Sequence, residues 1–137
     1  MAETGMPVLL VDDDRFMRTV LGQILQDAGY QGFQASNGRE ALALCQERHF
    51  PVILTDWVMP EMDGLAFCRA FRSHHSGSYS YLILLTSQEG KDKLIAGLES
   101  GADEYLTKPV HEAELLVRLK TAQRILDLES SLQKSLE

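Results

Sequence analysis

Five side chains that could take part in chemistry share one feature: each stands at the end of a short, mostly apolar run of the sequence. They are Asp12, Asp13, Asp56, Thr86 and Lys108. Clustered carboxylates repel one another, so such a group is costly unless a cation neutralises it. Oxygen ligands without cysteine or histidine partners select Mg²⁺ over zinc. If these side chains converge, the sequence predicts a Mg²⁺ site beside a hydroxyl group and an ammonium group.

Such a site would suit a phosphoryl group. A Mg²⁺ ion with open coordination positions favours phosphate oxygens as its remaining ligands. The Lys108 ammonium would bring a positive charge to the same group, and the Thr86 hydroxyl would donate to one of its oxygens. The Asp56 carboxylate could then act as a nucleophile and form an acyl phosphate, with catalysis carried by positioning and charge neutralisation.

Residues 51–64, which contain Asp56, define the clearest of these positions. The apolar run at 52–54, with β-branched Val52 and Ile53, is too short for a helix and suits a strand buried on both faces. It leads into Asp56 and then breaks at two turn-forming pairs, Met59-Pro60 and Asp63-Gly64. Taken alone, Asp56 has a simpler interpretation, as a carboxylate that accepts hydrogen bonds from backbone amides in a turn. Only the rest of the chain favours a site.

The remaining sequence alternates apolar runs with amphipathic helical patterns. Strands are predicted at 7–11, 31–35, 52–54, 81–85 and 104–107. Helices are predicted at 16–28 with Gly29 as the stop, from a Ser36-Asn37-Gly38 cap to about His49, at 65–71, at 89–99 and at 111–137. Such alternation implies a parallel sheet with right-handed crossovers and helices on both faces. The carboxyl ends of parallel strands share one edge, where the five polar side chains would meet.

Each of these side chains also has an ordinary structural interpretation. Asp12, Asp13 and Asp14 could cap a helix N-terminus, where the dipole favours negative charge. Thr86 could be a cap, and Lys108 a solvated surface residue. All of them falling together at strand ends is not expected by chance, and we therefore interpret them as one site.

Composition limits the classes of function. With 137 residues, of which 45% are hydrophobic and 24% charged, the chain fits one globular domain with a real core. A net charge of −7 leaves no basic stripe for phosphates, which argues against nucleic-acid binding by this domain. No apolar run approaches the ~18 residues that span a membrane, and residues 1–5 lack a basic, apolar leader. We therefore expect a cytoplasmic protein without membrane contact.

The cysteines and one histidine pair receive structural interpretations. Cys45 and Cys68 lie in amphipathic patterns without CxxC spacing, which is typical of small core residues in a reducing compartment. His74 and His75 lie in a polar stretch that continues to Ser80. Adjacent histidines without an acidic or cysteine partner nearby are expected to be solvated rather than to bind a metal.

Together, the motifs resemble the receiver domain of response regulators in two-component signalling, of the chemotaxis-regulator type. The matching segments are Asp12-Asp13 after 8–11, Asp56 with 59–64, Leu84-Leu85-Thr86-Ser87, Gly101-Ala102-Asp103-Glu104-Tyr105 and Leu106-Thr107-Lys108-Pro109. The resemblance implies an α/β, flavodoxin-like, doubly wound (βα)5 fold with a five-stranded parallel sheet of order 2-1-3-4-5. It implies a receiver domain at 1–122 and an extended C-terminal helix over 123–137.

The resemblance also implies roles for the aspartates. Asp56 would accept a phosphoryl group from a sensor histidine kinase, a phosphotransfer protein or a small phosphodonor. Asp13 and Asp56 would bind Mg²⁺, or alternatively Mn²⁺, directly, whereas Asp12 would act mainly through water. The backbone carbonyl of Val58 would be a further ligand. The domain would be no enzyme in the ordinary sense, because it catalyses only its own phosphoryl transfer and dephosphorylation.

By the same resemblance, Thr86 and Lys108 would hold phosphoryl oxygens, and Ser87 would be the small neighbour that the phosphoryl group requires. Thr86 and Tyr105 would form a switch, in which the hydroxyl moves toward the phosphate and the ring turns inward behind it. Pro109 is expected to follow a cis peptide bond. The side chains of Val58 and Gln88 would border the path of a hydrolytic water, which Val58 cannot orient.

The switch would be a population shift, because phosphorylation adds ~1.5–2 negative charges at Asp56. It would change the partner surface formed by the helix at 89–99, the strand at 104–107 and the helix from 111. The tail repeats apolar residues at helical spacing, at Ile125, Leu128, Leu132 and Leu136. This pattern fits either a solvated helix end or a helix that pairs in a homodimer or leads into an output domain. A homodimer through the partner surface is the further alternative.

Three other functions fit parts of the pattern. A haloacid-dehalogenase-like phosphatase would need an Asp-x-Asp-x-Thr/Val motif, which residues 12–16 lack. A flavodoxin-like FMN carrier would need a hydroxyl- and glycine-rich phosphate loop where this chain has three aspartates. A receiver that works only as a phosphorylation-independent docking or dimerisation module is the third, and the complete set of site residues argues against it.

Overall fold

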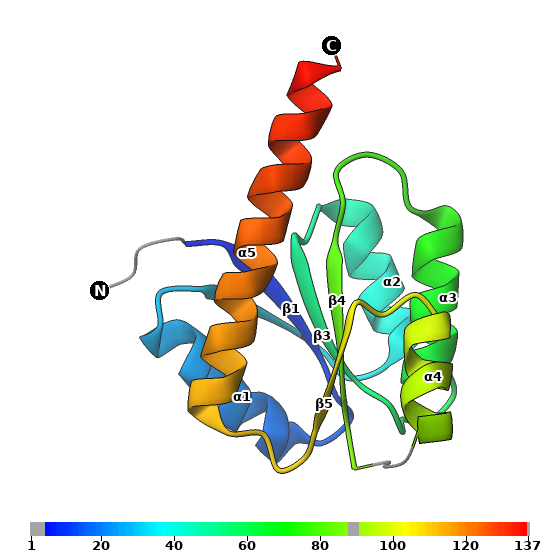
Figure 1. The fold of residues 1–137 in the computed structure, drawn as a ribbon. Coiled ribbons are helices and arrows are strands. Elements are labelled where there is room, and N and C mark those ends of the chain that lie inside the picture. Colours follow the sequence, from blue (N-terminus) through cyan, green and yellow to red (C-terminus); the bar gives the residue numbers. More distant parts are fainter. Residues whose placement is uncertain (1–4, 88–90, 137) are drawn as a thin grey trace.

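The computed structural model describes residues 5–87 and 91–136 of the chain. In this part of the chain, a single parallel sheet forms the centre of the molecule (Figure 1). Its strands are β1 (Pro7–Val11), β2 (Gln31–Ala35), β3 (Val52–Asp56), β4 (Tyr81–Thr86) and β5 (Glu104–Thr107). All neighbouring pairs are parallel, in the order β2-β1-β3-β4-β5. This confirms the predicted flavodoxin-like topology, and each strand lies where the apolar runs predicted it.

Among the described residues, five helices cover the two faces of the sheet. They are α1 (Arg15–Asp27), α2 (Gly38–Glu47), α3 (Gly64–His74), α4 (Lys91–Glu99) and α5 (Glu112–Ser135). Glu89, where the fourth helix was predicted to begin, lies outside the described residues. Helices α1 and α5 pack on one face, and α2, α3 and α4 lie on the other (Figure 1). Within the described part of the chain, no helix has the length and apolarity needed to cross a membrane.

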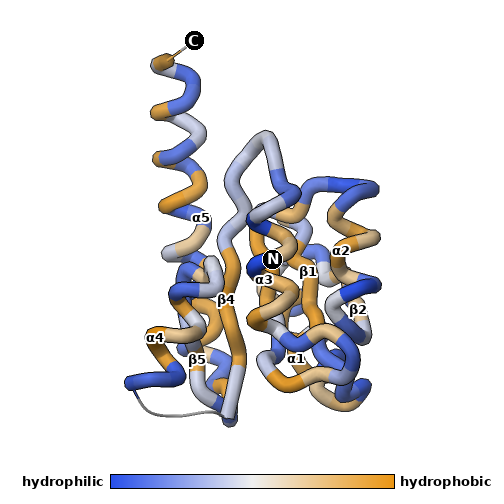
Figure 2. Tube along the Cα trace, turned by 90° about the vertical axis from the view of Figure 1, so that its right-hand side faces the viewer, coloured by the Kyte–Doolittle hydropathy of each residue, from blue (hydrophilic) through white to orange (hydrophobic). Residues whose placement is uncertain are grey.

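The central strands are apolar because both of their faces are covered. Leu10 and Leu54 point into the cluster beneath α1 and α5, whereas Leu9 and Ile53 point into the cluster beneath α2 and α3. All four side chains are fully buried, and β1 and β4 are hydrophobic along their length (Figure 2). Burying each such side chain contributes about 1.5–3 kcal/mol to stability. The sheet is therefore a rigid frame for the residues at its edge.

Side-chain caps fix the helices that begin at the carboxyl edge of the sheet. Asp14, Asn37 and Asp63 each accept a hydrogen bond from a backbone amide in the first turn of α1, α2 and α3, respectively. The predicted stop after α1 is also present, since Gly29 has a φ of 95° that a residue with a side chain rarely adopts. These local signals explain why the helix boundaries were readable from the sequence.

The junction between β3 and α3 is unusually close. The Gly64 amide donates to the Trp57 carbonyl at 2.7 Å. A Cβ atom at Gly64 would lie 2.3 Å from the Asp56 carbonyl oxygen, far inside contact distance. Only glycine lets the first turn of α3 approach the backbone of Asp56 in this way.

Replacing Gly64 by alanine should therefore destabilise the protein, because the added methyl group must push α3 away from Asp56. We expect the free energy of unfolding to fall by roughly 1–3 kcal/mol, the scale of overpacking in a core. Urea unfolding followed by circular dichroism measures this loss. Gly32→Ala is the matched control, since its Cβ would meet only a Leu25 methyl group at an ordinary 3.8 Å. Equal unfolding midpoints for the two variants would contradict the prediction.

Candidate functional site

The topology brings the predicted site residues to one edge of the sheet. Asp12 follows β1, Asp56 ends β3 and Thr86 ends β4, while Lys108 follows β5. The ends of β4 and β5 are joined directly, because the Lys108 amide donates to the Thr86 carbonyl at 2.8 Å. Parallel strands with their carboxyl ends in register thus assemble a cluster from residues up to 96 positions apart in the chain.

Three carboxylates form the centre of the cluster. Oxygen atoms of Asp12, Asp13 and Asp56 all lie within 4.8 Å of one another. Asp12 is 1% exposed and Asp56 8%, whereas Asp13 is exposed. Asp12 Oδ1 accepts from the Asp14 amide, and Asp56 Oδ1 accepts from the Trp57 amide, both at 2.9 Å. Backbone geometry therefore orients both buried carboxylates into the same space.

Lys108 is the cation of this cluster. Its Nζ lies 3.0 Å from Asp56 Oδ1 and 3.6 Å from Asp12 Oδ2. Burial alone would lower the pKa of the lysine, but the hydrogen bond and charge of Asp56, together with Asp12, outweigh burial and raise it. Lys108 is therefore a fixed positive charge that contacts both carboxylates at once.

The cluster nevertheless carries more negative than positive charge, and Asp12 shows the consequence. Burial is the largest cause that raises the pKa of Asp12, and the charges of Asp56 and Asp13 add to it. Asp12 Oδ2 is buried and has no hydrogen-bond partner among the described residues. A buried carboxylate oxygen without a hydrogen bond, whose ion pair with Lys108 Nζ is as long as 3.6 Å, suits a divalent cation with hard oxygen ligands. The residues present fit such a cation.

The residues that were predicted to surround the cluster differ in their exposure. Thr86 is buried, Ser87 is exposed beside it, and the Val58 side chain is 60% exposed. Gln88, which was predicted to border a water path, lies outside the described residues. The Lys108–Pro109 peptide bond is cis, as the resemblance implied.

Tyr105 contacts a residue that the sequence did not single out. The rings of Tyr105 and Trp57 meet edge to face, with centroids 6.1 Å apart and planes at 87°. Gly97 of α4 is buried against both, since a Cβ there would lie 3.3 Å from Tyr105 Cδ2 and 3.7 Å from Trp57 Cζ3. Trp57 directly follows Asp56 in the chain, so this three-residue contact links the acidic cluster to α4. A glycine within the last turn of a predicted helix was the available signal.

Arg18 is a second residue that sequence reasoning missed. Its Nη1 donates to the backbone carbonyl of Asp12 at 2.7 Å, and its Nε donates to Gln34 Oε1 at 3.3 Å. The guanidinium thus ties α1 and β2 to the turn that carries Asp12. No sequence pattern marks it, because its role depends on the tertiary position of a backbone oxygen.

The histidines and cysteines lie away from this cluster. Within the described residues, the three aspartates are the single group of three or more carboxylate, histidine or cysteine side chains that could hold a metal ion. His74 is exposed and His75 is half-buried, with its ring stacked on that of Phe71 at a centroid distance of 4.7 Å. Burial raises the pKa of Cys45 to about 11 and that of Cys68 to about 12. Both thiols are free, and neither is a nucleophile at neutral pH.

Comparison with known proteins agrees with this geometry. A sequence profile of the response regulator receiver domain matches residues 8–120. The transcriptional regulatory protein GltR of Pseudomonas aeruginosa is 40% identical over 125 residues, which are 90% of this chain and 51% of that protein. The response regulator MprA of Mycolicibacterium vanbaalenii is 40% identical over 117 residues, 85% of this chain and 50% of that protein. The chain thus spans about half the length of these relatives.

Solved structures with a similar fold also include chemotaxis and response regulator proteins. The chemotaxis protein CheY4 of Vibrio cholerae superposes with a TM-score of 0.80 at 37% identity, over 85% of this chain and 98% of that one. A probable two-component response regulator/GGDEF domain protein superposes with a TM-score of 0.83 at 29% identity, over 89% of this chain and 50% of that one.

The charge imbalance predicts how Asp12→Asn behaves. Because the folded state raises the pKa of Asp12, its charge costs stability at neutral pH, and this cost falls as the pH falls. We expect Asp12→Asn to raise the free energy of unfolding by roughly 1 kcal/mol without a divalent cation. A cation at ten times its Kd should stabilise the native protein by about 1.4 kcal/mol and the variant by less.

Urea unfolding with and without Mg²⁺ or Mn²⁺ measures both effects. Asp127→Asn, an exposed carboxylate of α5, is the charge-matched control and should behave like the native protein. An equal response to the cation in native protein and Asp12→Asn would be the contrary result.

Proposed function

Because the chain belongs to the response regulator receiver domain family, we propose that it is a phosphorylation-dependent signalling switch with Asp56 as its phosphoacceptor. The donor would be a sensor histidine kinase, a phosphotransfer protein or a small phosphodonor. The observation that carries the proposal is the contact of Lys108 Nζ with Asp56 Oδ1 at 3.0 Å, inside a cluster that also holds Asp12 and Asp13. The family is one of signalling modules, and this chain would turn over no substrate beyond its own phosphoryl group.

In the transfer step, a carboxylate oxygen of Asp56 attacks the phosphorus atom of the donor. The new O–P bond forms as the bond from phosphorus to the donor nitrogen or oxygen breaks, and the electron pair leaves with the donor. Asp12, Asp13, Asp56 and the Val58 carbonyl would hold Mg²⁺, or Mn²⁺ in its place. When bound, the ion would supply positive charge that offsets the repulsion between the incoming group and the carboxylates.

Lys108 and Thr86 would stabilise the product. Lys108 bridges Asp56 and Asp12 before transfer, so its ammonium already lies within reach of the new phosphoryl oxygens. Thr86 ends the neighbouring strand and would donate its hydroxyl to one of them. Ser87, next to it, leaves space for the group. Hydrolysis later would return Asp56 to the carboxylate, and the exposed Val58 side chain offers no hydrogen bond to the attacking water.

The signal would pass through Tyr105. As Thr86 moves toward the phosphoryl group, the Tyr105 ring would turn inward, and its contacts with Trp57 and Gly97 would change. Because α4 packs on that ring through Gly97, α4 would shift with it. The changed partner surface would be that of α4, β5 and α5, where Leu94, Ile95 and Leu98 of α4 form an exposed apolar group.

The partners follow from this chemistry. We propose that the domain acts in the cytoplasm, with a histidine kinase or phosphotransfer protein docking at the acidic edge. With a net charge of −7, it would make no nucleic-acid contact of its own. Longer relatives are named transcriptional regulators, so any such output would belong to a part of those proteins that this chain does not cover.

Phosphoryl uptake is the direct test. After incubation with acetyl phosphate and Mg²⁺, the native protein should gain the mass of one phosphoryl group, measured by intact mass spectrometry. Asp56→Asn, which keeps the size and removes the nucleophile, should gain none. A gain in both proteins would identify another acceptor. Absence of a gain in the native protein, with cation binding confirmed, would favour the docking-module alternative.

The switch has its own optical test, because Trp57 is the single tryptophan of the sequence. The fluorescence emission of Trp57 should change with the same time course as the mass gain, because the Tyr105 ring would move away from its edge-to-face contact with the indole ring. In Thr86→Ala, uptake should slow by roughly tenfold, because a lost hydrogen bond to a charged group costs at least about 1.5 kcal/mol. The emission change per phosphoryl group should also shrink.

Thr107→Ala is the matched control for Thr86→Ala, since Thr107 pairs with Thr86 across β4 and β5 but is exposed. It should keep the native rate and the native emission change. A full emission change per phosphoryl group in Thr86→Ala would rule out the coupling of Thr86 to Tyr105.

A further inference from the structure

The second half of α5 leaves the body of the domain. The fully buried residues of this 24-residue helix are Leu115, Leu119 and Ala122, all in its first half. Beyond Ala122, Leu126 is partly buried against the core, and the helix then continues alone to Ser135 (Figure 1). Because helices run opposite to the strands, this extension projects from the edge of the sheet opposite to Asp56.

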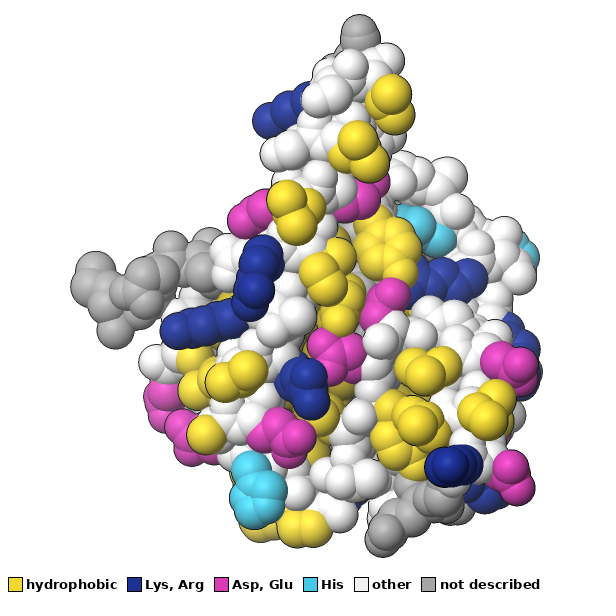
Figure 3. Space-filling view, viewed as in Figure 1, with side chains coloured by type: hydrophobic (Ala, Val, Ile, Leu, Met, Phe, Trp, Pro, Cys, Tyr) yellow, Lys and Arg dark blue, Asp and Glu magenta, His cyan; other side chains and the backbone are white. Residues whose placement is uncertain are grey.

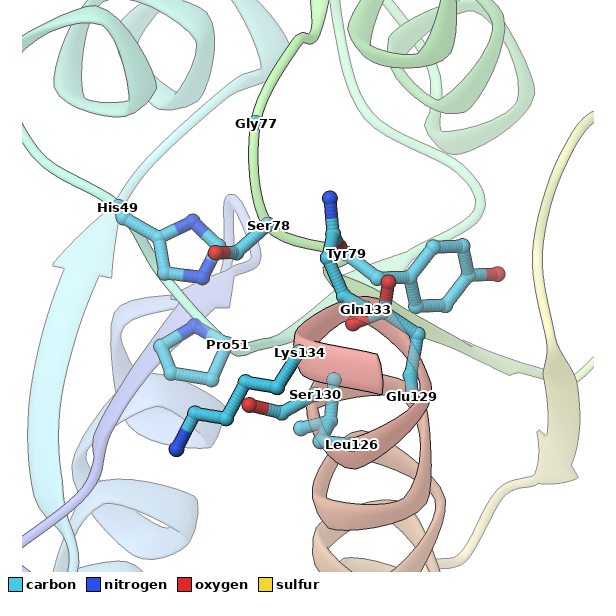
Figure 4. Close-up of a pocket in the computed structure, with 10 residues that line it drawn as sticks. All are labelled: His49, Pro51, Gly77, Ser78, Tyr79, Leu126, Glu129, Ser130, Gln133 and Lys134. Carbon is cyan, nitrogen blue, oxygen red and sulfur yellow. The ribbon is translucent and has the colours of Figure 1, made fainter. Parts of the chain in front are cut away.

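One side of the extension still faces the domain. Leu126, Glu129 and Gln133 line a cavity of about 400 Å³ whose far wall is His49 and residues 77–79 (Figure 4). The wall mixes opposite charges with small polar groups and contains no deeply buried polar side chain, so it is not a built ligand site. It does show which side of α5 the domain occupies.

A different side of the extension carries an apolar stripe that nothing in the described chain covers. Ile125, Leu128 and Leu132 are 39%, 65% and 64% exposed, and Leu136 continues the row. Spaced three and four residues apart, these side chains share one side of the helix. Figure 3 shows hydrophobic side chains following one another up the projecting helix. The spacing of this row matches the seam of a two-stranded coiled coil if Ile125 and Leu132 are placed at a and Leu128 at d.

We propose that this stripe pairs with the same stripe of a second copy, in a parallel, in-register coiled coil. The charges beside the seam identify the occupant. In this heptad, Arg124 lies at g and Glu129 at e, so Glu129 stands between the stripe and the cavity that it also lines. In a parallel in-register pair, each g residue faces the e residue five positions later on the other helix, so Arg124 of each copy meets Glu129 of the other. Antiparallel helices would set e against e and g against g.

The fold also limits where the seam begins. One heptad before Ile125, the a position holds Arg118, whose Nε lies 3.3 Å from Glu104 Oε1 on β5. Arg118 is thus engaged within its own domain, and the residue at the next d position, Thr121, is polar. The seam would therefore start at Ile125, past Ala122, the last fully buried residue of α5.

An interface of barely two heptads is small, so the pairing is weak. Buried areas below about 1,000 Å² are typical of transient association. We expect a monomer–dimer equilibrium in sedimentation velocity between about 10 µM and 1 mM, a range of Kd worth about 4–7 kcal/mol. The seam and the acidic cluster lie at opposite edges of the sheet, so the proposal does not depend on the phosphoryl chemistry.

Charge exchange tests the proposal. Arg124→Glu and Glu129→Arg each turn both interhelical pairs into like-charge pairs, and each should weaken self-association about tenfold. An equimolar mixture should regain native association as a heterodimer. There, the acidic side chain introduced in one variant faces the basic side chain introduced in the other, while the unchanged Arg124 faces the unchanged Glu129. Lys134→Glu and Asp127→Arg make the same kinds of charge reversal at the c positions, away from the seam, and should leave association unchanged.

Recovery on mixing cannot arise from altered helix stability in either variant, because each chain keeps its own substitution. The proposal would be overturned if Arg124→Glu and Glu129→Arg associated as strongly as the native protein. So would weakening without recovery on mixing, or a native protein that stays monomeric at 1 mM.

Discussion

Mutual repulsion among three carboxylates is the constraint on which this structure depends. Asp12 and Asp56 are buried at the carboxyl edge of a parallel sheet, Asp13 lies beside them, and Lys108 contacts both buried members. Holding such a group together stores unfavourable electrostatic energy, which the apolar core must offset. The rise in the pKa of Asp12, caused first by burial and then by its neighbours, records that cost. A binding event that supplies positive charge relieves it.

The contacts that join the acidic cluster to the neighbouring helices are tightly packed. Gly64 allows α3 to approach the backbone of Asp56, and Gly97 allows α4 to approach the rings of Trp57 and Tyr105. At both positions a methyl group would already crowd its neighbours. Where packing is this close, a displacement at the cluster in the proposed switch would be passed on to a helix. Gly64 and Gly97 would thus couple the acidic cluster to α3 and α4, because neither glycine has a side chain that would hold the helix away.

The sequence predicted the strands and helices, which depend on local residue patterns. It did not predict contacts between side chains that only tertiary packing brings together. Strands β1, β3 and β4 were readable because their runs are apolar on both faces, and the residue after each run marks the same edge. The stacking of His75 on Phe71 was not predicted, and neither was the bond from Arg18 to the Asp12 carbonyl. Nor was the role of Arg72, which joins α3 to Asp103 and to the Gly101 carbonyl. Each joins residues whose approach is set by tertiary packing.

The alternation of strands and helices also separates the two surfaces on which function would depend. Every strand delivers its last residue to the acidic edge, so every helix that follows must end at the opposite edge, and α5 extends from there. A homodimer seam along Ile125, Leu128 and Leu132 would therefore leave the phosphoacceptor open to its donor. Communication between the two would have to run through α5 itself, whose first half packs on the same core as β4 and β5. The Arg118–Glu104 contact lies on that route, one heptad before the seam would begin.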